Sequence, residues 1–178
     1  MRNQHRAGVF VAAALLVASS VSGHTVINEG EAVAGELTFI TLRVTHGCGT
    51  SPTTSFRVQI PEGVTRVTAR YLSDWKITKT MRKLDTPFKN EDGTMVTETI
   101  SEVTWSGGSL PDGYYGEFQL RAMMPKEPGK MLYFKSIQGC EKGEIRWIEV
   151  AKPGDPPMSV KEPAPFIKLI APAARKGA

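Results

Sequence analysis

Apolar and polar residues alternate with a period of two along most of this chain. In residues 56–60 the apolar Phe56, Val58 and Ile60 are separated by single polar residues, the pattern of a strand with one buried face and one wet face. The same alternation predicts further strands at residues 37–44, 64–71, 75–81, 96–105, 115–123, 131–136 and 144–150. The pattern therefore predicts about eight short strands.

Turn-forming residues lie between these predicted strands. Clusters of Gly with Pro, Asn, Asp, Ser or Lys occur at residues 61–63, 90–93, 106–108, 111–113, 127–129 and 142–143. Gly favours tight turns because it adopts positive φ without a steric cost. No convincing helical stripe appears after residue 23. Many short strands joined by regular turns predict an all-β fold, an antiparallel two-sheet sandwich of immunoglobulin or cupredoxin type.

The N-terminus has the layout of a secretory signal peptide. It opens with the charges of Arg2 and Arg6, continues with an apolar run over residues 9–18, and has small residues before a plausible cleavage site. The apolar run is shorter than the roughly 20 residues of a membrane-spanning helix, and no later segment approaches that length. We expect residues 1–23 to be removed and the mature chain to begin at His24, in the periplasm or outside the cell.

Length and composition predict one domain after cleavage. The mature chain has about 155 residues, which suits a single domain with a real core. We expect the sandwich to span residues 24–150. The remainder, residues 151–178, is rich in proline, and its apolar piece at residues 166–170 is a candidate for a last edge strand.

The charge of the chain argues against a nucleic-acid partner. The net charge is +4, and two of the positive charges, Arg2 and Arg6, belong to the predicted signal peptide. The remaining Lys and Arg residues are scattered along the sequence rather than gathered in a stripe. A basic face of the kind that binds nucleic acid is therefore not predicted.

Two cysteines, Cys48 and Cys140, lie in the exported part of the chain. In an oxidising compartment an isolated pair is most often a disulfide, so we predict that these two residues are bonded. The alternative is a pair of unpaired, buried thiols. A bridge over so long a loop would stabilise the fold by nominally about 4–5 kcal/mol in the chain-entropy treatment.

A mature N-terminus at His24 would place an imidazole and a free α-amine on one residue. The amine nitrogen and Nδ1 can close a six-membered ring on a metal ion. Cu(II) suits such a pair best, because it heads the divalent affinity order and favours square arrangements of nitrogen and oxygen ligands. An α-amine has a pKa of about 8 and gives up its proton readily to a strong metal. The alternative for His24 is an ordinary surface histidine.

Four sequence blocks point to a known family. They are His24-Thr-Val, His46-Gly-Cys-Gly-Thr-Ser-Pro-Thr-Thr54 with the following Val-Gln-Ile-Pro-Glu-Gly-Val, Trp105-Ser-Gly-Gly-Ser-Leu-Pro-Asp-Gly, and Gly143-Glu-Ile-Arg-Trp147. In this order they resemble the YcnI-like family and cover nearly the whole mature chain. The resemblance implies a β-sandwich that binds copper in the periplasm or at the cell surface. In that family the N-terminal histidine braces the copper with its own amine, a carboxylate completes the site, and a tryptophan lies close to it.

The family pattern assigns roles to three residues of this chain. His24 corresponds to the bidentate ligand, and Trp147 to the neighbouring tryptophan, with a plain core aromatic as its alternative. Glu117 is the best candidate for the carboxylate, because it alternates to the face opposite Phe118 and Leu120. Its alternative is a solvated carboxylate on a strand.

His46 is the only other histidine left after cleavage. If the family brace uses a single histidine, His46 is spare. It lies two residues before Cys48, so it is either a histidine at a strand end near the disulfide or a group near the metal. An N-terminal histidine plus one internal histidine is also the ligand set of a polysaccharide-oxidising copper monooxygenase.

These observations favour a non-catalytic protein of copper homeostasis. We expect it to capture and buffer Cu(II), or to hand it as a metallochaperone to another periplasmic or membrane copper-handling protein. The first alternative is an enzyme, a copper monooxygenase using His24 and His46. The second is an immunoglobulin-like interaction module that binds no metal.

Overall fold

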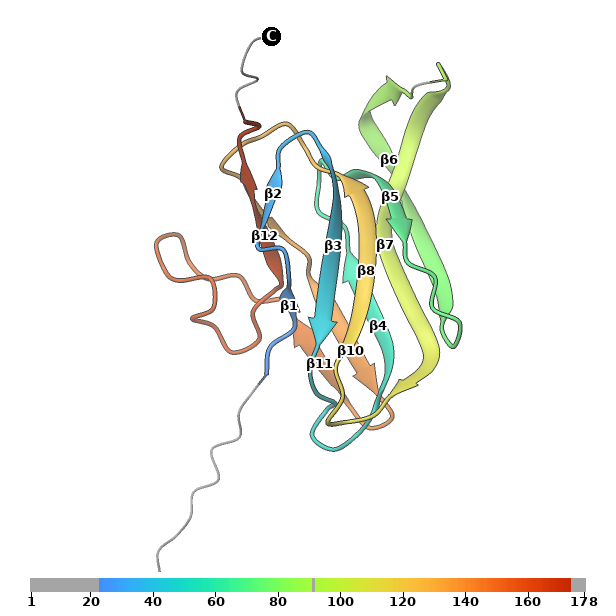
Figure 1. Cartoon of the computed structure of the whole chain (residues 1–178), viewed down its shortest axis with the longest axis vertical. Coiled ribbons are helices and arrows are strands. Elements are labelled where there is room, and N and C mark those ends of the chain that lie inside the picture. Colours follow the sequence, from blue (N-terminus) through green and yellow to red (C-terminus); the bar gives the residue numbers. More distant parts are fainter. Residues whose placement is uncertain (1–22, 91, 174–178) are drawn as a thin grey trace, which may run out of the picture.

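A computed structural model describes residues 23–90 and 92–173 of the chain. The predicted signal peptide therefore lies outside the described residues, apart from Gly23. Within these two ranges the regular structure consists of twelve strands and no helix, which confirms the predicted all-β class (Figure 1). Accordingly, the described residues contain no helix that is long and apolar enough to cross a membrane.

The strands follow the chain in this order: β1 (Val26–Ile27), β2 (Glu31–Val33), β3 (Leu37–Val44), β4 (Thr53–Gln59), β5 (Thr65–Ala69), β6 (Lys76–Lys89), β7 (Met95–Leu110), β8 (Gly116–Met123), β9 (Met131–Tyr133), β10 (Ser136–Cys140), β11 (Glu144–Trp147) and β12 (Phe166–Ile170).

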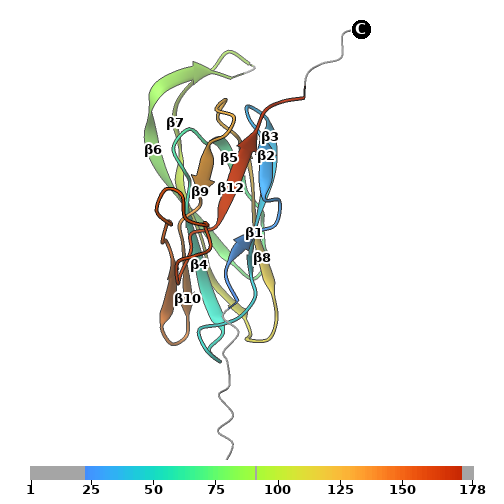
Figure 2. The same cartoon turned by 90° about the vertical axis from the view of Figure 1, so that its left-hand side faces the viewer.

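Two main sheets face one another, and a smaller one lies along one side between them (Figure 2). One main sheet has the strand order β1-β3-β8-β5 and the other β11-β10-β4-β7-β6. The small sheet has the order β2-β12-β9. All pairs are antiparallel except β2 with β12. The arrangement is the predicted two-sheet sandwich.

The core forms where the inward residues of the two main sheets meet. On β3 the side chains of Ile40 and Leu42 are fully buried, and on β4 Phe56 is fully buried. Phe56 stacks on Phe118 of β8 with ring centroids 4.6 Å apart, which joins the two sheets. Burying each such side chain contributes about 1.5–3 kcal/mol, so the period-two pattern of the sequence supplies most of the driving force for this fold.

The β6–β7 hairpin is longer than the alternation predicts, with 14 and 16 residues in its two strands. It rises above the rest of the sandwich in Figure 1. Beyond Met81 the side chains of β6 are mostly exposed on both faces. A ribbon with two wet faces has no apolar period, which is why the sequence predicts the strand only as far as Met81. Its lysines suit an edge strand, because their charge opposes pairing with another chain.

The predicted strand at residues 131–136 is in fact two strands in different sheets. β9 pairs with β12, whereas β10 pairs with β4. The change of partner falls at Phe134 and Lys135, and Phe134 itself is fully buried. A strand that leaves one sheet for another keeps its apolar pattern, so alternation alone does not reveal the break.

The proline-rich C-terminal part contributes a central strand and not an edge strand. β12 lies between β2 and β9, in parallel register with β2 and antiparallel register with β9. Its side chains Ile167 and Leu169 are fully buried. The packed sandwich therefore continues beyond residue 150, as far as Ile170.

Candidate metal centre

One end of the sandwich gathers four segments that are distant in sequence. They are the start of the domain at residues 23–25, the loop at 45–52, the turn at 111–115 and the turn at 141–143, all at the lower end in Figure 1. The disulfide between Cys48 and Cys140 joins the loop at 45–52 to the end of β10, directly before the turn at 141–143, with an S–S distance of 2.09 Å, which confirms the predicted bridge. The Ser51 hydroxyl accepts a hydrogen bond from the amide of Lys142 at 2.9 Å and strengthens the same junction.

The loop that carries His46 is held on both sides. The amide of Gly47 donates to the carboxylate of Asp112 at 3.0 Å, and the amide of Cys48 donates to the carbonyl of Ser51 at 3.0 Å. Space at Gly47 is so tight that a Cβ would lie 2.1 Å from the Ser51 carbonyl oxygen. Gly47 and Cys48 therefore fix the backbone conformation next to His46, and with it the position of the imidazole.

Two histidines meet the same indole ring. The His24 ring centroid lies 5.9 Å from that of Trp147 with an interplanar angle of 83°, and the His46 ring centroid lies 6.1 Å away at 76°. Both are edge-to-face contacts, the geometry that the ring quadrupoles prefer. Trp147 is 2 % exposed and is buried apart from the main apolar cluster. The structure thus brings together His24, His46 and Trp147, three of the residues that the sequence singles out.

Gln138 ties this group to the interior, and the sequence analysis missed it. Its side-chain oxygen accepts the Trp147 indole N–H at 3.1 Å, and its amide nitrogen donates to the His46 carbonyl at 2.6 Å and to the Thr53 hydroxyl at 2.8 Å. Gln138 is fully buried. Apolar alternation gave no signal for it, because the polar Ser136 and Gln138 are the buried residues of this strand and the apolar Ile137 between them is only partly buried.

Both ring nitrogens of His46 face carbonyl oxygens. Nδ1 lies 2.6 Å from the carbonyl oxygen of Gly47, and Nε2 contacts the carbonyl oxygen of Gly23. Gly23 directly precedes His24, so His46 points at the peptide bond where cleavage is predicted. A Cβ on Gly23 would also crowd the His46 ring, which shows how closely the two segments approach.

Glu117 lies on the outer face of the β1-β3-β8-β5 sheet. It pairs in register with Arg43, which in turn pairs with Val26 of β1. An Arg43 guanidinium nitrogen lies 3.4 Å from the Glu117 carboxylate, and both side chains are about one third exposed. The predicted alternation of Glu117 against Phe118 is confirmed by the burial pattern of β8. Among the described residues, no hydrogen bond or ion pair joins Glu117 to His24 or His46.

The donor atoms at this end suit a brace better than a conventional cage. Among the described residues, no three His, Cys, Asp or Glu side chains gather in a way that could hold a metal ion. A brace needs fewer side chains, because one histidine supplies two nitrogens. Next to His24, the buried hydroxyl of Thr25 has no hydrogen-bond partner among the described residues. The nitrogens of His24, with His46 against the same indole, are donors of the kind that Cu(II) favours.

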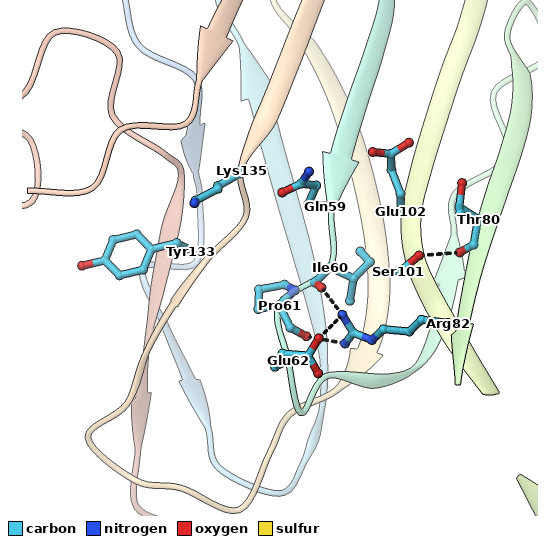
Figure 3. Close-up of a pocket in the computed structure, with 10 residues that line it drawn as sticks. All are labelled: Gln59, Ile60, Pro61, Glu62, Thr80, Arg82, Ser101, Glu102, Tyr133 and Lys135. Atoms are coloured by element: carbon cyan, nitrogen blue, oxygen red, sulfur yellow. Dashed lines mark hydrogen bonds and ion pairs between the residues drawn. The ribbon is translucent and has the colours of Figure 1, made fainter. Parts of the chain in front are cut away.

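A separate hollow of about 450 Å³ lies beside Gln59, Arg82 and Tyr133. Figure 3 shows the Arg82 guanidinium directed at the turn that follows β4. There it donates to the carbonyls of Ile60 and Pro61, each at 3.0 Å, and pairs with the Glu62 carboxylate at 2.8 Å. The Arg82 guanidinium is thus occupied in holding a turn. Among the described residues that line the hollow, which also include Glu102 and Lys135, there is no histidine or cysteine.

Comparisons with known proteins support the fold and place the chain in a family. The profile of a family described as "Domain of unknown function (DUF1775)" matches residues 24–169. A crystal structure of an uncharacterized protein from Nocardia farcinica, described as immunoglobulin-like, is similar with a TM-score of 0.61 and 19% identity. The match covers 83% of this chain and 98% of that one, and at this identity it shows the fold alone. No curated protein matches the sequence significantly.

Proposed function

The chain belongs to the DUF1775 family, the domain of the YcnI-like proteins, and from this premise we propose that it is an exported protein that binds Cu(II). It captures the ion, buffers it, and hands it on, without catalysing a reaction. The brace forms from the imidazole and the α-amine of His24 once the signal peptide has been removed. The uncleaved precursor lacks the free amine and therefore lacks the site.

The position of His24 against Trp147 carries this proposal. An N-terminal residue without a tertiary contact would move freely and would hold a metal poorly. Here the His24 ring has a rigid, buried neighbour, and β1 pairs with β3 only two residues later. The family match also begins at residue 24, the residue at which cleavage is predicted. A positioned first residue is what a brace requires.

Trp147 would shield one side of the proposed site from solvent. A large apolar ring beside the ion excludes water from that side. The local dielectric constant falls, so the electrostatic attraction between the ion and its ligands becomes stronger. His24 itself is half-buried, so the opposite side faces solvent. That open side lets an incoming donor approach before the old ligands leave, which suits transfer to a periplasmic or membrane copper-handling partner.

A copper monooxygenase is the second candidate function, and the contact of both His24 and His46 with Trp147 favours it over a metal-free module. A monooxygenase also needs a surface to grip its polysaccharide, and the sequence offers one tyrosine pair, Tyr114 and Tyr115, at this end. Oxygen consumption by the copper-loaded protein, with a reductant and a polysaccharide, distinguishes the two. A carrier shows no polysaccharide-dependent turnover, whereas a monooxygenase releases oxidised sugars.

The experiment for the proposed function is a Cu(II) titration followed by electron paramagnetic resonance. It uses the secreted protein, with its N-terminus checked by mass, and a matched variant with one alanine added before His24. We expect one Cu(II) with a nitrogen-rich spectrum in the native form, and loss of that spectrum in the extended form. Equal binding by both forms, or by neither, would contradict the brace. Absence of binding would leave the interaction module as the function.

A further inference from the structure

We infer that His46 is the second protein residue that binds the copper ion, through Nε2, and that Glu117 is not a ligand. Removal of the segment that ends at Gly23 opens the coordination position of His46. The inference rests on the proposed function, because it concerns the same ion and the same amine. It gives the site three nitrogen donors: the α-amine and Nδ1 of His24, and Nε2 of His46.

The first support is the contact between His46 Nε2 and the Gly23 carbonyl oxygen. That carbonyl is bonded to the nitrogen of His24, and within one peptide group the oxygen and nitrogen are only about 2.3 Å apart. Cleavage removes the carbonyl and turns the His24 nitrogen into the amine. His46 Nε2 then faces the amine across the space that the carbonyl occupied. Metal–nitrogen bonds of about 2 Å would bridge two nitrogens that are separated by about 4 Å.

The second support is the partner of the other ring nitrogen of His46. Nδ1 lies 2.6 Å from the Gly47 carbonyl oxygen, and a carbonyl can only accept a hydrogen bond. In the mature chain this contact holds the imidazole proton on Nδ1 and leaves the lone pair on Nε2. Metal-binding histidines are commonly oriented in this way, with one nitrogen bound to the metal and the other donating to a carbonyl.

The third support is the rigidity of the two imidazoles relative to each other. His46 is anchored by the Cys48–Cys140 bridge and by the bond from Gln138 to its own carbonyl at 2.6 Å. Its ring and that of His24 both lie edge-on to Trp147. Two rings fixed on one wall are already organised for a shared ion, which lowers the entropy cost of binding.

The position of Glu117 argues against its role as the third ligand. The carboxylate pairs with Arg43 on the outer face of its sheet, with β3 lying between β8 and β1. His24 and His46 instead lie against a tryptophan of the opposite sheet. To bind the same ion, Glu117 would have to leave Arg43 and reach past β3.

Pulsed electron paramagnetic resonance of the copper-loaded mature protein tests the inference without any substitution. The remote nitrogens of copper-bound imidazoles modulate the echo, so the method counts bound imidazoles. We expect two, whereas one would overturn the inference. A single imidazole together with an intact N-terminal brace would leave the proposed function standing.

Matched variants provide the second test, with affinity measured by calorimetric Cu(II) titration. His46→Ala should weaken binding by more than the roughly 10–100-fold that loss of a group supporting a ligand costs. Glu117→Gln should stay within about 3-fold of the native affinity, since it alters an ion pair on a different face. Far-ultraviolet circular dichroism checks that each variant is folded. A large loss of affinity in Glu117→Gln with near-native affinity in His46→Ala would instead make Glu117 the ligand. Loss of binding only on alanine extension would refute the role of His46 and support the brace.

Discussion

The indole N–H of Trp147 donates to the side-chain oxygen of Gln138 at 3.1 Å, between two residues that are both buried. The same Gln138 side chain donates to the backbone carbonyl of His46 at 2.6 Å. A single amide therefore fixes the tryptophan ring and the histidine loop to each other. The relative placement of His24, His46 and Trp147 depends on it, because both imidazoles rest on that ring.

We predict that Gln138→Leu destabilises the fold and weakens copper binding. The leucine leaves the Trp147 N–H and the His46 carbonyl without their partners, and each buried, unpaired group costs about 1–3 kcal/mol. Urea unfolding should show a loss of at least about 2 kcal/mol. In Gln138→Glu, an acceptor for Trp147 remains but no donor for His46, so we expect an intermediate effect on affinity. Native stability in the leucine variant would refute the role of the network.

The loop that carries His46 should be sensitive to a single methyl group at Gly47. A Cβ there would lie 2.1 Å from the Ser51 carbonyl, so Gly47→Ala must shift the backbone, at about 1–3 kcal/mol. Gly49→Ala is the matched control in the same loop. Gly49 has a φ of 65° and open space around its Cβ position, so its substitution costs only about 1–2 kcal/mol of backbone strain.

The two variants should differ most clearly in copper affinity. Gly47→Ala moves the residue next to His46 and should lower affinity, whereas Gly49→Ala should leave it near the native value. Calorimetric titration of the folded variants measures both. Equal affinities would mean that the loop backbone does not set the position of His46.

Copper binding should quench tryptophan fluorescence, and Trp147 should account for most of the effect. Its ring lies 5.9 Å from that of His24, within reach of an ion bound there. In Trp147→Phe the quenching by Cu(II) should therefore be largely lost. Trp75→Phe is the control, because Trp75 packs on Phe118 in the core at 5.1 Å. Unchanged quenching in Trp147→Phe would place the copper elsewhere.

The last strand should matter as much to stability as any strand of the two main sheets. Ile167 is fully buried, and we expect Ile167→Ala to lower the free energy of unfolding by about 2–5 kcal/mol. Lys168→Ala, on the exposed face of the same strand, should change it by less than about 0.5 kcal/mol. Urea unfolding of both variants tests this. A small effect at Ile167 would mean that the proline-rich part is a dispensable tail.

Alternation of apolar residues was sufficient to predict most strands of the two main sheets. The strand at residues 37–44 matches β3 to the residue, because every second side chain there faces the core. Where neither face is buried, as in the outer half of β6, the signal disappears. β1 and β2 have two and three residues and were not predicted, since so short a segment shows no period. Partners that are distant in sequence decide which sheet a strand joins. For this reason alternation did not predict the division of residues 131–136 into β9 and β10, or the position of β12 between β2 and β9.

The site was predicted in its chemistry more than in its geometry. The sequence identifies His24 through the predicted cleavage site, His46 as the other mature histidine and Trp147 through the family resemblance. It does not show that both imidazoles contact one indole. That meeting depends on a strand of the opposite sheet and on a disulfide between residues 48 and 140. Glu117 was assigned to the site by family resemblance. The structure places its carboxylate against Arg43, a pairing set by register across β3.

The parallel pairing of β2 with β12 limits how early in folding the small sheet can form. Residues 31–33 find their partners only at residues 168–170, so this pairing encloses almost the whole domain. Contacts of such long sequence separation form late, because the loop entropy must be overcome first. If the chain is exported as proposed, its first strands must therefore wait for the last one to emerge before they can pair. On the proposed export route, a chain halted midway through the translocation channel would lack this pairing, so completion of the small sheet would be coupled to completed export.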